Sequence, residues 1–241
     1  MIPFLGPADP FPPVAQALDQ PDGLLAAGGS LTTRRLVDAY RRGIFPWFNE
    51  GDPILWWSPD PRTVLRPPRV HVSHSLKKRL RKESFVVTID RVFTRVLDGC
   101  AAPRPGDSGT WLGVPMRRAY TALHSAGLAH SIEVWMDGEL AGGIYGVAIG
   151  RMFFGESMFS RRTDASKIAM VRLAAQLDRW GFPLIDCQLE TEHLVSLGAE
   201  QMPRRAFIAE VTRLTGLAGP KWEFDADLAG SPGHAPRRRL P

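Results

Sequence analysis

Three polar side chains occur at positions where a strand pattern predicts apolar residues. Asp186 and Gln188 lie two residues apart in the segment PLIDCQL, and Glu156 lies in the segment FFGESMF. Because alternate residues of a strand share a face, Asp186 and Gln188 are predicted to point to one side of their strand. Ile185 and Cys187 are predicted to point to the other side. A buried carboxylate is costly unless it is paired, hydrogen-bonded or functional.

Two strands that each present a carboxylate favour a pocket with polar groups at its floor over a structural role for either one. The flanking side chains are apolar: Phe153, Phe154, Met158, Phe159 and Ile185. The chain contains no Walker A, GxSxG, HExxH or CxxC motif and no GxGxxG after a strand. Ser157 has no spacing that ties it to a histidine and an acid. The pattern therefore favours a site that positions two substrates and manages one proton over covalent catalysis.

The composition is that of a globular protein. The 241 residues are 44% hydrophobic and 23% charged. Two cysteines, Cys100 and Cys187, are too few for a disulfide framework or a structural zinc site, so no metal is expected. No apolar run is long enough to cross a bilayer, and the first residues lack the pattern of a signal peptide. We expect a cytoplasmic protein without a membrane segment.

The positive charge is concentrated in one segment. The net charge is +5, and seven cations without an intervening acid lie between residues 66 and 82. On a helix that begins near Ser75, Leu76 and Leu80 face inward and the cations face out. Such a stripe of cations either binds a phosphate backbone or is a solvated helix face without a partner. The cations proposed to contact phosphates are Lys77, Lys78, Arg79, Arg81 and Lys82.

Local signals divide the chain into two domains and a tail. Residues 1–62 form a small domain rich in Pro and Trp, with a helix capped by Ser30 and ended by Gly43. Residues 63–217 form a larger α+β domain with a mostly antiparallel mixed sheet, in which 129–160 supply three antiparallel strands and 165–181 a long helix. Residues 218–241 are predicted to be a flexible tail.

Three glycines, Gly142, Gly143 and Gly146, remove side chains from the middle strand of that sheet. Either a ligand or a second piece of backbone approaches closely there. The sequence leaves both explanations open.

Several strings occur in unbroken order from about Asp22 to Phe207: GLLAAGGSLTTRRLVDAYRRGIFPWF, PILWWSPDPR, GTW, AHSIEVW, GGIYGVAIGRMFFGESMFS, ASK, LIDCQ, HLVSLGA and PRRAF. Together they resemble the leucyl/phenylalanyl-tRNA-protein transferase family. The resemblance implies an aminoacyltransferase that moves Leu, Phe or Met from its tRNA to the α-amino group of proteins that begin with Arg or Lys. That transfer creates an N-terminal degradation signal.

The resemblance also implies a C-terminal domain related to the GNAT acyltransferases, without metal, coenzyme A or another cofactor. It assigns Gln188 to the incoming amine, Asp186 to polarising or fixing it, and Glu156 to the cationic N-terminal residue. Whether Asp186 accepts the proton or only orients its neighbours stays open.

A pocket for an unbranched or aromatic side chain is expected around Phe153, Met158, Met170, Leu173 and Ile185, although methionines at helical spacing are more often plain core. The resemblance places Trp47, Trp111 and Tyr120 near the terminal adenosine, where an aromatic face stacks on a base. The basic helix then holds the acceptor stem through its phosphates.

Two alternatives compete with this interpretation. A coenzyme A-dependent N-acetyltransferase requires a glycine-containing run of backbone amides before the long helix, and FSRRTDASK contains no glycine there. A non-catalytic RNA-binding module explains the basic segment and the tryptophans but leaves the three polar strand residues unexplained. Nothing in the sequence requires more than a monomer.

Overall fold

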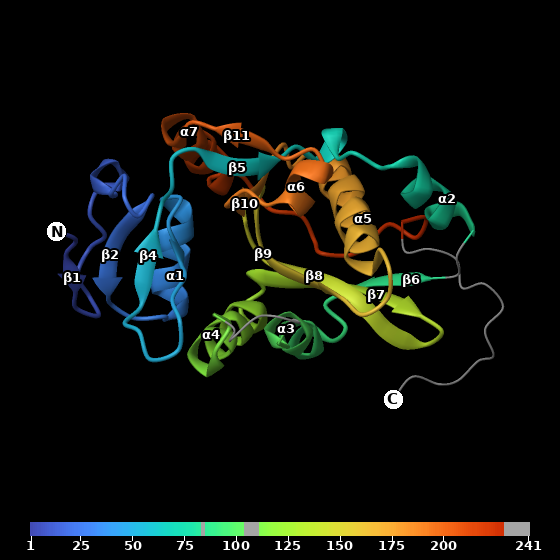
Figure 1. The fold of residues 1–241 in the computed structure, drawn as a ribbon, viewed down its shortest axis with the longest axis horizontal. Coiled ribbons are helices and arrows are strands. Elements are labelled where there is room, and N and C mark those ends of the chain that lie inside the picture. Colours follow the sequence, from blue (N-terminus) through green and yellow to red (C-terminus); the bar gives the residue numbers. More distant parts are fainter. Residues whose placement is uncertain (83–84, 104–110, 229–241) are drawn as a thin grey trace.

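The computed structural model describes residues 1–82, 85–103 and 111–228, which form two sheets with helices packed on them (Figure 1). The first sheet is small and has the order β1-β2-β4-β3. Its strands are β1 (Phe4–Leu5), β2 (Leu24–Gly28), β3 (Phe45–Pro46) and β4 (Leu55–Trp57), with α1 (Thr33–Arg41) beside them. The side chain of Thr32 caps α1, so the predicted cap at Ser30 is two residues early.

The second sheet has the order β11-β5-β10-β9-β8-β7-β6. Its strands are β5 (Arg62–Leu65), β6 (Val86–Ile89), β7 (Ala129–Met136), β8 (Glu139–Ile149), β9 (Met152–Ser160), β10 (Ile185–Gln188) and β11 (Glu200–Met202). Strands β6 to β9 pair in antiparallel fashion, as predicted for 129–160, and β9 pairs with β10 in parallel. The α+β class and the mostly antiparallel mixed sheet are confirmed.

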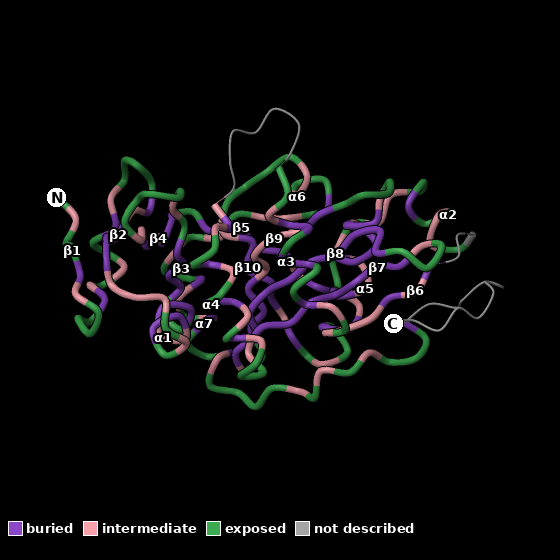
Figure 2. Tube along the Cα trace, turned by 90° about the horizontal axis from the view of Figure 1, so that it is seen from below, coloured by how far each residue is buried: buried purple, intermediate pink, exposed green. Residues whose placement is uncertain are grey.

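Helices cover both faces of the larger sheet. Helices α3 (Phe93–Ala101) and α4 (Val114–Ser125) lie on one face, and α5 (Ala165–Arg179) lies on the other (Figure 1). The remaining helices are α2 (His74–Lys82), α6 (Glu192–Ser196), α7 (Arg204–Thr215) and the 3-10 turns η1 (Val14–Gln16) and η2 (Pro67–Arg69). Buried residues follow the central strands between these layers (Figure 2). Within the described residues, no helix is both long and apolar enough to cross a membrane.

The first part of the predicted tail packs on the larger domain. The ring of Trp222 stacks on His130, with centroids 3.8 Å apart, and Arg179 of α5 binds Asp225 and Asp227 at 2.8 and 2.7 Å. The prediction of a flexible tail is therefore wrong for residues 218–228, because aromatic and charged contacts fix them. Residues 229–241 lie outside the described residues.

The glycines of β8 are explained by close packing of protein atoms. A Cβ on Gly142 would meet the Cβ of Ala165 at 2.7 Å, and one on Gly146 would meet the carbonyl oxygen of Phe154 at 2.3 Å. A Cβ on Gly143 would lie 2.8 Å from the carbonyl oxygen of Ile132. Side chains at these positions would push the neighbouring strands and α5 away.

We expect Gly146→Ala to lower the free energy of unfolding by about 1–3 kcal/mol, because the added methyl group overpacks against backbone. Gly155→Ala is the matched control. Gly155 pairs with Gly146 across the sheet, but its Cβ would lie 3.5 Å from the nearest atom, an ordinary contact. Urea denaturation of both variants measures the difference, and equal losses would contradict this explanation.

Candidate active site

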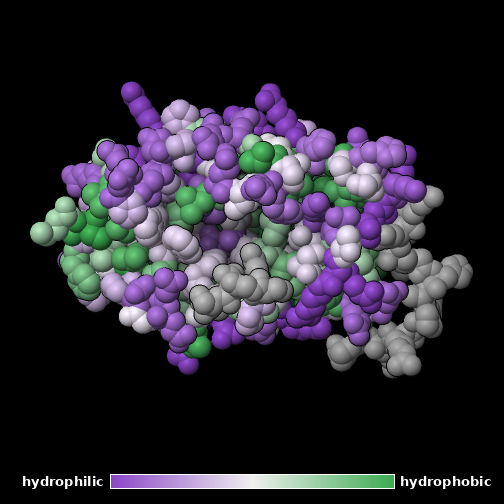
Figure 3. Space-filling view, in the orientation of Figure 1, coloured by the Kyte–Doolittle hydropathy of each residue, from purple (hydrophilic) through white to green (hydrophobic). Residues whose placement is uncertain are grey.

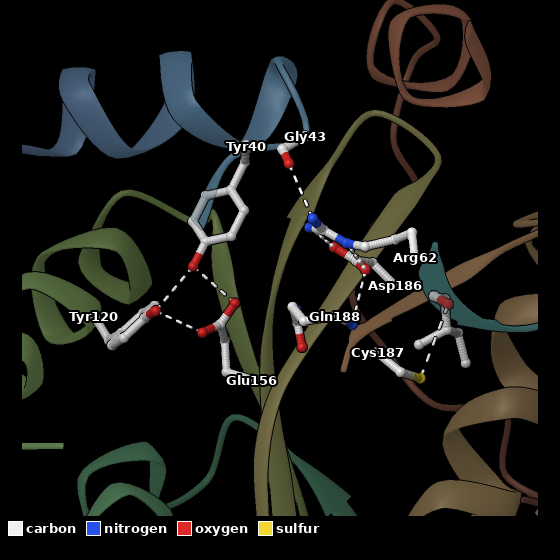
Figure 4. A network of polar contacts seen from close by, with 9 residues as sticks. Tyr40, Gly43, Arg62, Tyr120, Glu156, Asp186, Cys187 and Gln188 are labelled. Carbon is white, nitrogen blue, oxygen red and sulfur yellow. Dashed lines mark hydrogen bonds and ion pairs between the residues drawn. The ribbon is translucent and has the colours of Figure 1, made fainter. Parts of the chain in front are cut away.

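An ion pair between Arg62 and Asp186 lies fully buried where β5 and β10 pair. Arg62 donates from Nε to Oδ1 at 2.8 Å and from Nη2 to Oδ2 at 2.7 Å, and the side chains are 1% and 0% exposed (Figure 4). The remaining nitrogen, Nη1, donates to the carbonyl oxygen of Gly43 at 3.1 Å. Phe45 and Phe207 lie within 4.8 Å of the guanidinium carbon. The fork geometry satisfies both oxygens of Asp186 without substrate.

Gln188 depends on this pair for its position. Its backbone N–H donates to Oδ1 of Asp186 at 3.0 Å, and its φ of 59° lies in the left-handed region that a glutamine rarely adopts. The register between β10 and β5 shifts between these two residues. The predicted alternation of faces is therefore wrong. Gln188 and Cys187 both line a cavity of about 640 Å³ beside β9, whereas Asp186 does not.

Glu156 is held by two tyrosines. Tyr40 donates to Oε1 at 2.7 Å and Tyr120 donates to Oε2 at 2.5 Å, and the two hydroxyl oxygens lie 2.8 Å apart (Figure 4). The three residues come from α1, α4 and β9, so the small domain contributes directly to this cluster. Burial, and next the charge of Glu156, raises the pKa of both tyrosines, so they stay protonated as donors at neutral pH.

The pKa of Glu156 is raised from 4.5 to about 7. Burial is the largest cause, the two tyrosine hydrogen bonds oppose it, and the charge of Asp186 adds to it. Near neutral pH this carboxyl group is therefore divided between its protonated and charged forms. A cation placed beside it would favour the charged form and release a proton.

The cavity of about 640 Å³ runs from Glu156 and Gln188 along β9 to Arg161 (Figure 3 shows this face hollowed near its centre). Its walls come from the end of α3, from β9 and from α5 and α6. The apolar part includes Ile144, Met158, Phe159, Met170 and Leu194. Nε2 of Gln188 is buried and has no hydrogen-bond partner in the described chain. An unpaired buried amide in a cavity is suited to meeting a substrate.

Only part of the pocket predicted for the transferred side chain forms as predicted. Met158 and Met170 line the cavity, whereas Phe153, Leu173 and Ile185 are fully buried in the core beside α5. Those three lie behind the wall of the cavity and do not form its surface.

The three predicted aromatic residues near the adenosine separate in the structure. Tyr120 is fully buried and bonds to Glu156, so it presents no free face for stacking. Trp111 packs partly buried against the core. Trp47 is 42% exposed and lies edge-on to Trp57. Only Trp47 offers an exposed ring of the kind predicted.

The cysteine in the cavity is not a nucleophile in this environment. Burial, and next the charge of Asp186, raises the pKa of the Cys187 thiol, so it stays protonated. In the part of the chain that the structure describes, no group of three His, Cys, Asp or Glu side chains is placed to hold a metal ion.

The basic segment forms α2 as predicted, with Leu76 buried and Leu80 packed against the core. Lys77, Lys78 and Arg81 are exposed. Arg79 instead binds Asp164 at 3.0 Å, which joins α2 to the start of α5. The side chain of Lys82 lies outside the described residues.

Sequence reasoning missed Arg62 and Tyr40 as members of the site. A buried Asp186 did indicate a need for a cation, but the chain holds 30 Lys and Arg. Arg62 stood at the predicted domain boundary, and Tyr40 lies within the helix predicted between Ser30 and Gly43 without an assigned role. Their partners lie 124 and 116 residues away, beyond any local pattern.

Family models match most of the chain. The leucyl/phenylalanyl-tRNA protein transferase model matches residues 64–212, and the N-terminal domain model of the same family matches residues 29–60. Relatives named leucyl/phenylalanyl-tRNA–protein transferase include those of Nitrosomonas europaea, 57% identical over 95% of this chain and 98% of the relative, and Thiobacillus denitrificans, 60% identical over 90% and 96%.

Similar solved structures include a GCN5-related N-acetyltransferase from Kribbella flavida, at 13% identity and a TM-score of 0.36 over 67% of this chain and 57% of that one. The structure of L-PGS from Bacillus licheniformis matches at 11% identity and a TM-score of 0.38, over 71% and 57%. The assignment of the chain rests on the sequence matches.

These sequence matches define the chain as a transferase enzyme. It belongs to the leucyl/phenylalanyl-tRNA protein transferase family.

The carboxyl carbon of Glu156 should titrate near pH 7 in a ¹³C NMR experiment. Tyr120→Phe removes a hydrogen bond that lowers this pKa, so the midpoint should move upward. The raised folded-state pKa also means that the contribution of Glu156 to stability is full below about pH 4.5 and is lost as the pH rises through about 7.

Tyr145→Phe is the matched control, because the Tyr145 hydroxyl is buried without a partner in the described chain. In the Tyr145→Phe variant, the titration midpoint of Glu156 should equal that of the wild type. A midpoint near 4.5 in the wild type, or equal shifts in both variants, would contradict the proposed environment.

Proposed function

We propose that this chain transfers Leu, Phe or Met from aminoacyl-tRNA to the α-amino group of proteins that begin with Arg or Lys. The observation that carries the proposal is the placement of Gln188 and Glu156 at one end of a cavity whose remaining wall is largely apolar. The end with Gln188 and Glu156 suits the polar, cationic N-terminus of the acceptor protein. The apolar wall suits the side chain that is transferred. Membership of the family supports both substrates.

The reaction is aminolysis of an ester. The neutral α-amine attacks the carbonyl carbon, a C–N bond forms, and the ester C–O bond breaks as the ribose hydroxyl leaves. The amine loses one proton and the ribose oxygen gains one, so no outside energy source is needed. The protein's task is to align the two substrates and to stabilise the tetrahedral oxyanion.

Gln188 is the group proposed to contact the reacting atoms. Its amide oxygen accepts from the incoming amine, and its unpaired Nε2 donates to the developing oxyanion. Asp186 has both oxygens bound by Arg62 and lies outside the cavity, so its proposed role is to fix Gln188. The geometry favours this positioning role over proton acceptance by Asp186.

Glu156 is proposed to bind the cationic side chain of the N-terminal Arg or Lys. Its pKa near 7 allows it to release a proton when that cation arrives. Met158 and Met170 are proposed to contact the transferred side chain, with Phe153, Leu173 and Ile185 behind them. Their flexible thioethers suit side chains of different shapes.

The tRNA is proposed to bind through α2 and Trp47. Lys77, Lys78 and Arg81 are exposed and contact phosphates, and the exposed ring of Trp47 stacks on the terminal base. We further propose that the enzyme works in the cytoplasm as a monomer without a cofactor.

A coenzyme A-dependent acetyltransferase is less well supported. The backbone amides of Arg161 and Arg162 before α5 both donate to the carbonyl oxygen of Ala141. The carboxylate of Asp164 lies beside the start of the helix, where a pyrophosphate would be repelled. A function as a non-catalytic RNA-binding module would not explain the cavity or its unpaired amide.

The experiment that tests the proposal supplies radiolabelled Leu-tRNA or labelled acetyl-coenzyme A with a peptide that begins with Arg. Label should enter the peptide from Leu-tRNA alone. An N-acetylated copy of the peptide is the control and should accept none. Label from acetyl-coenzyme A only, or from neither donor, would reject the proposal.

Neutralising Lys77, Lys78 and Arg81 to Gln should weaken tRNA binding and make the salt dependence of the affinity shallower by about 2.1–2.7 units of slope, because each lost phosphate contact removes about 0.7–0.9. The measurement is tRNA affinity at several salt concentrations. An unchanged slope would show that α2 lies off the tRNA.

A further inference from the structure

A second cavity of about 500 Å³ lies next to the first, between the start of α3 and the β7–β8 hairpin. Four arginines line this arginine groove: Arg91, Arg95, Arg161 and Arg162. All four are exposed, and Figure 3 shows strongly hydrophilic side chains gathered between α3 and the hairpin. Nothing in the proposed reaction uses these residues.

The charge of the groove is only partly balanced. Glu139 lies in its wall, and Asp137 binds Arg162 at 3.6 Å. Among the described residues, that is the single ion pair formed by these four arginines. Like charges gathered in one cavity repel, and an anion in the groove would relieve the repulsion.

Aromatic rings hold two of the guanidiniums in the groove. Arg95 lies over the ring of Trp135, 5.5 Å from its centroid, and Arg161 lies over Phe159 at 5.2 Å. A stacked guanidinium keeps its N–H donors directed sideways, where they suit the paired oxygens of a phosphate. The loop that carries Arg161 and Arg162 is fixed, since both backbone amides donate to Ala141.

The groove borders the proposed reaction site. Arg161 lines both cavities. On the other side of the same loop, Asp164 binds Arg79 of α2. The ion pair of Arg79 and Asp164 therefore joins α2, with its exposed cations, to the loop that carries Arg161 and Arg162.

We propose that the arginine groove binds backbone phosphates of the aminoacyl-tRNA whose esterified end occupies the adjacent cavity. The inference rests on the proposed function and adds a second contact surface, separate from α2. A polyanion that enters the cavity beside Arg161 has the groove along its path, whereas a peptide with a cationic N-terminus would be repelled there. The contact is to phosphate and is independent of base sequence.

The test is the double variant R91Q/R95Q, which leaves the cavity lining intact. The log–log slope of tRNA affinity against salt should become shallower by about 1.4–1.8, because two phosphate contacts are lost. The matched control is R205Q/R213Q on α7, which lies away from α3 and the β7–β8 hairpin (Figure 1), and its slope should equal that of the wild type. Equal slopes for all three proteins would overturn the proposal.

A second readout separates the groove from the reaction. Transfer from aminoacyl-adenosine, which carries no phosphate, depends on the cavity alone. The loss of kcat/KM in R91Q/R95Q should be at least tenfold larger with aminoacyl-tRNA than with aminoacyl-adenosine. Equal losses with the two donors, or a raised KM for the peptide with unchanged tRNA affinity, would reject the groove as a tRNA contact.

The outcomes distinguish this proposal from the proposed function. If the wild-type protein transfers label from neither Leu-tRNA nor acetyl-coenzyme A, the proposed function is rejected. The salt dependence of tRNA affinity still decides whether the groove binds RNA. A wild-type protein that transfers normally while R91Q/R95Q keeps its slope rejects the groove alone.

Discussion

The buried ion pair of Arg62 and Asp186 is the interaction on which the site depends. Removing two charges from water is expensive, and the protein offsets this with a two-pronged contact at 2.8 and 2.7 Å and a third bond to Gly43. Arg62 thereby joins β10 to the small domain and to Phe207 of α7. Removal of one partner alone would leave an uncompensated buried charge and would destabilise β10 at this point.

The consequence for the chemistry lies two residues beyond Asp186. The carboxylate of Asp186 accepts the backbone N–H of Gln188, which holds that residue in its left-handed conformation and puts its amide in the cavity. Glu156, on the neighbouring strand β9, is held by Tyr40 of the small domain. The small domain therefore helps to position both Gln188 and Glu156 through buried contacts, although it contributes no residue to the wall of the cavity.

The sequence predicted what local patterns determine. Alternation in 129–160 gave the three antiparallel strands, and helical spacing gave α5 and the inner face of α2. It also selected Glu156 and Gln188, because a polar residue in an apolar strand is visible locally. The partners Arg62 and Tyr40 are distant in the chain, and the irregularity at Gln188 arises from the Asp186 contact. Neither long-range pairing nor that local distortion has a signature in composition or period.

The most direct test of the positioning role of Asp186 is kcat, at saturating substrates, for R62Q, D186N and R62Q/D186N. Each single variant leaves one charge buried without its partner and should lose activity together with about 3–5 kcal/mol of stability. The double variant removes both charges, while the new carboxamide oxygen at position 186 can still accept from the Gln188 N–H. We predict that its kcat exceeds that of either single variant at least tenfold. A double variant no more active than D186N would contradict the account and would assign Asp186 a direct role in accepting the proton.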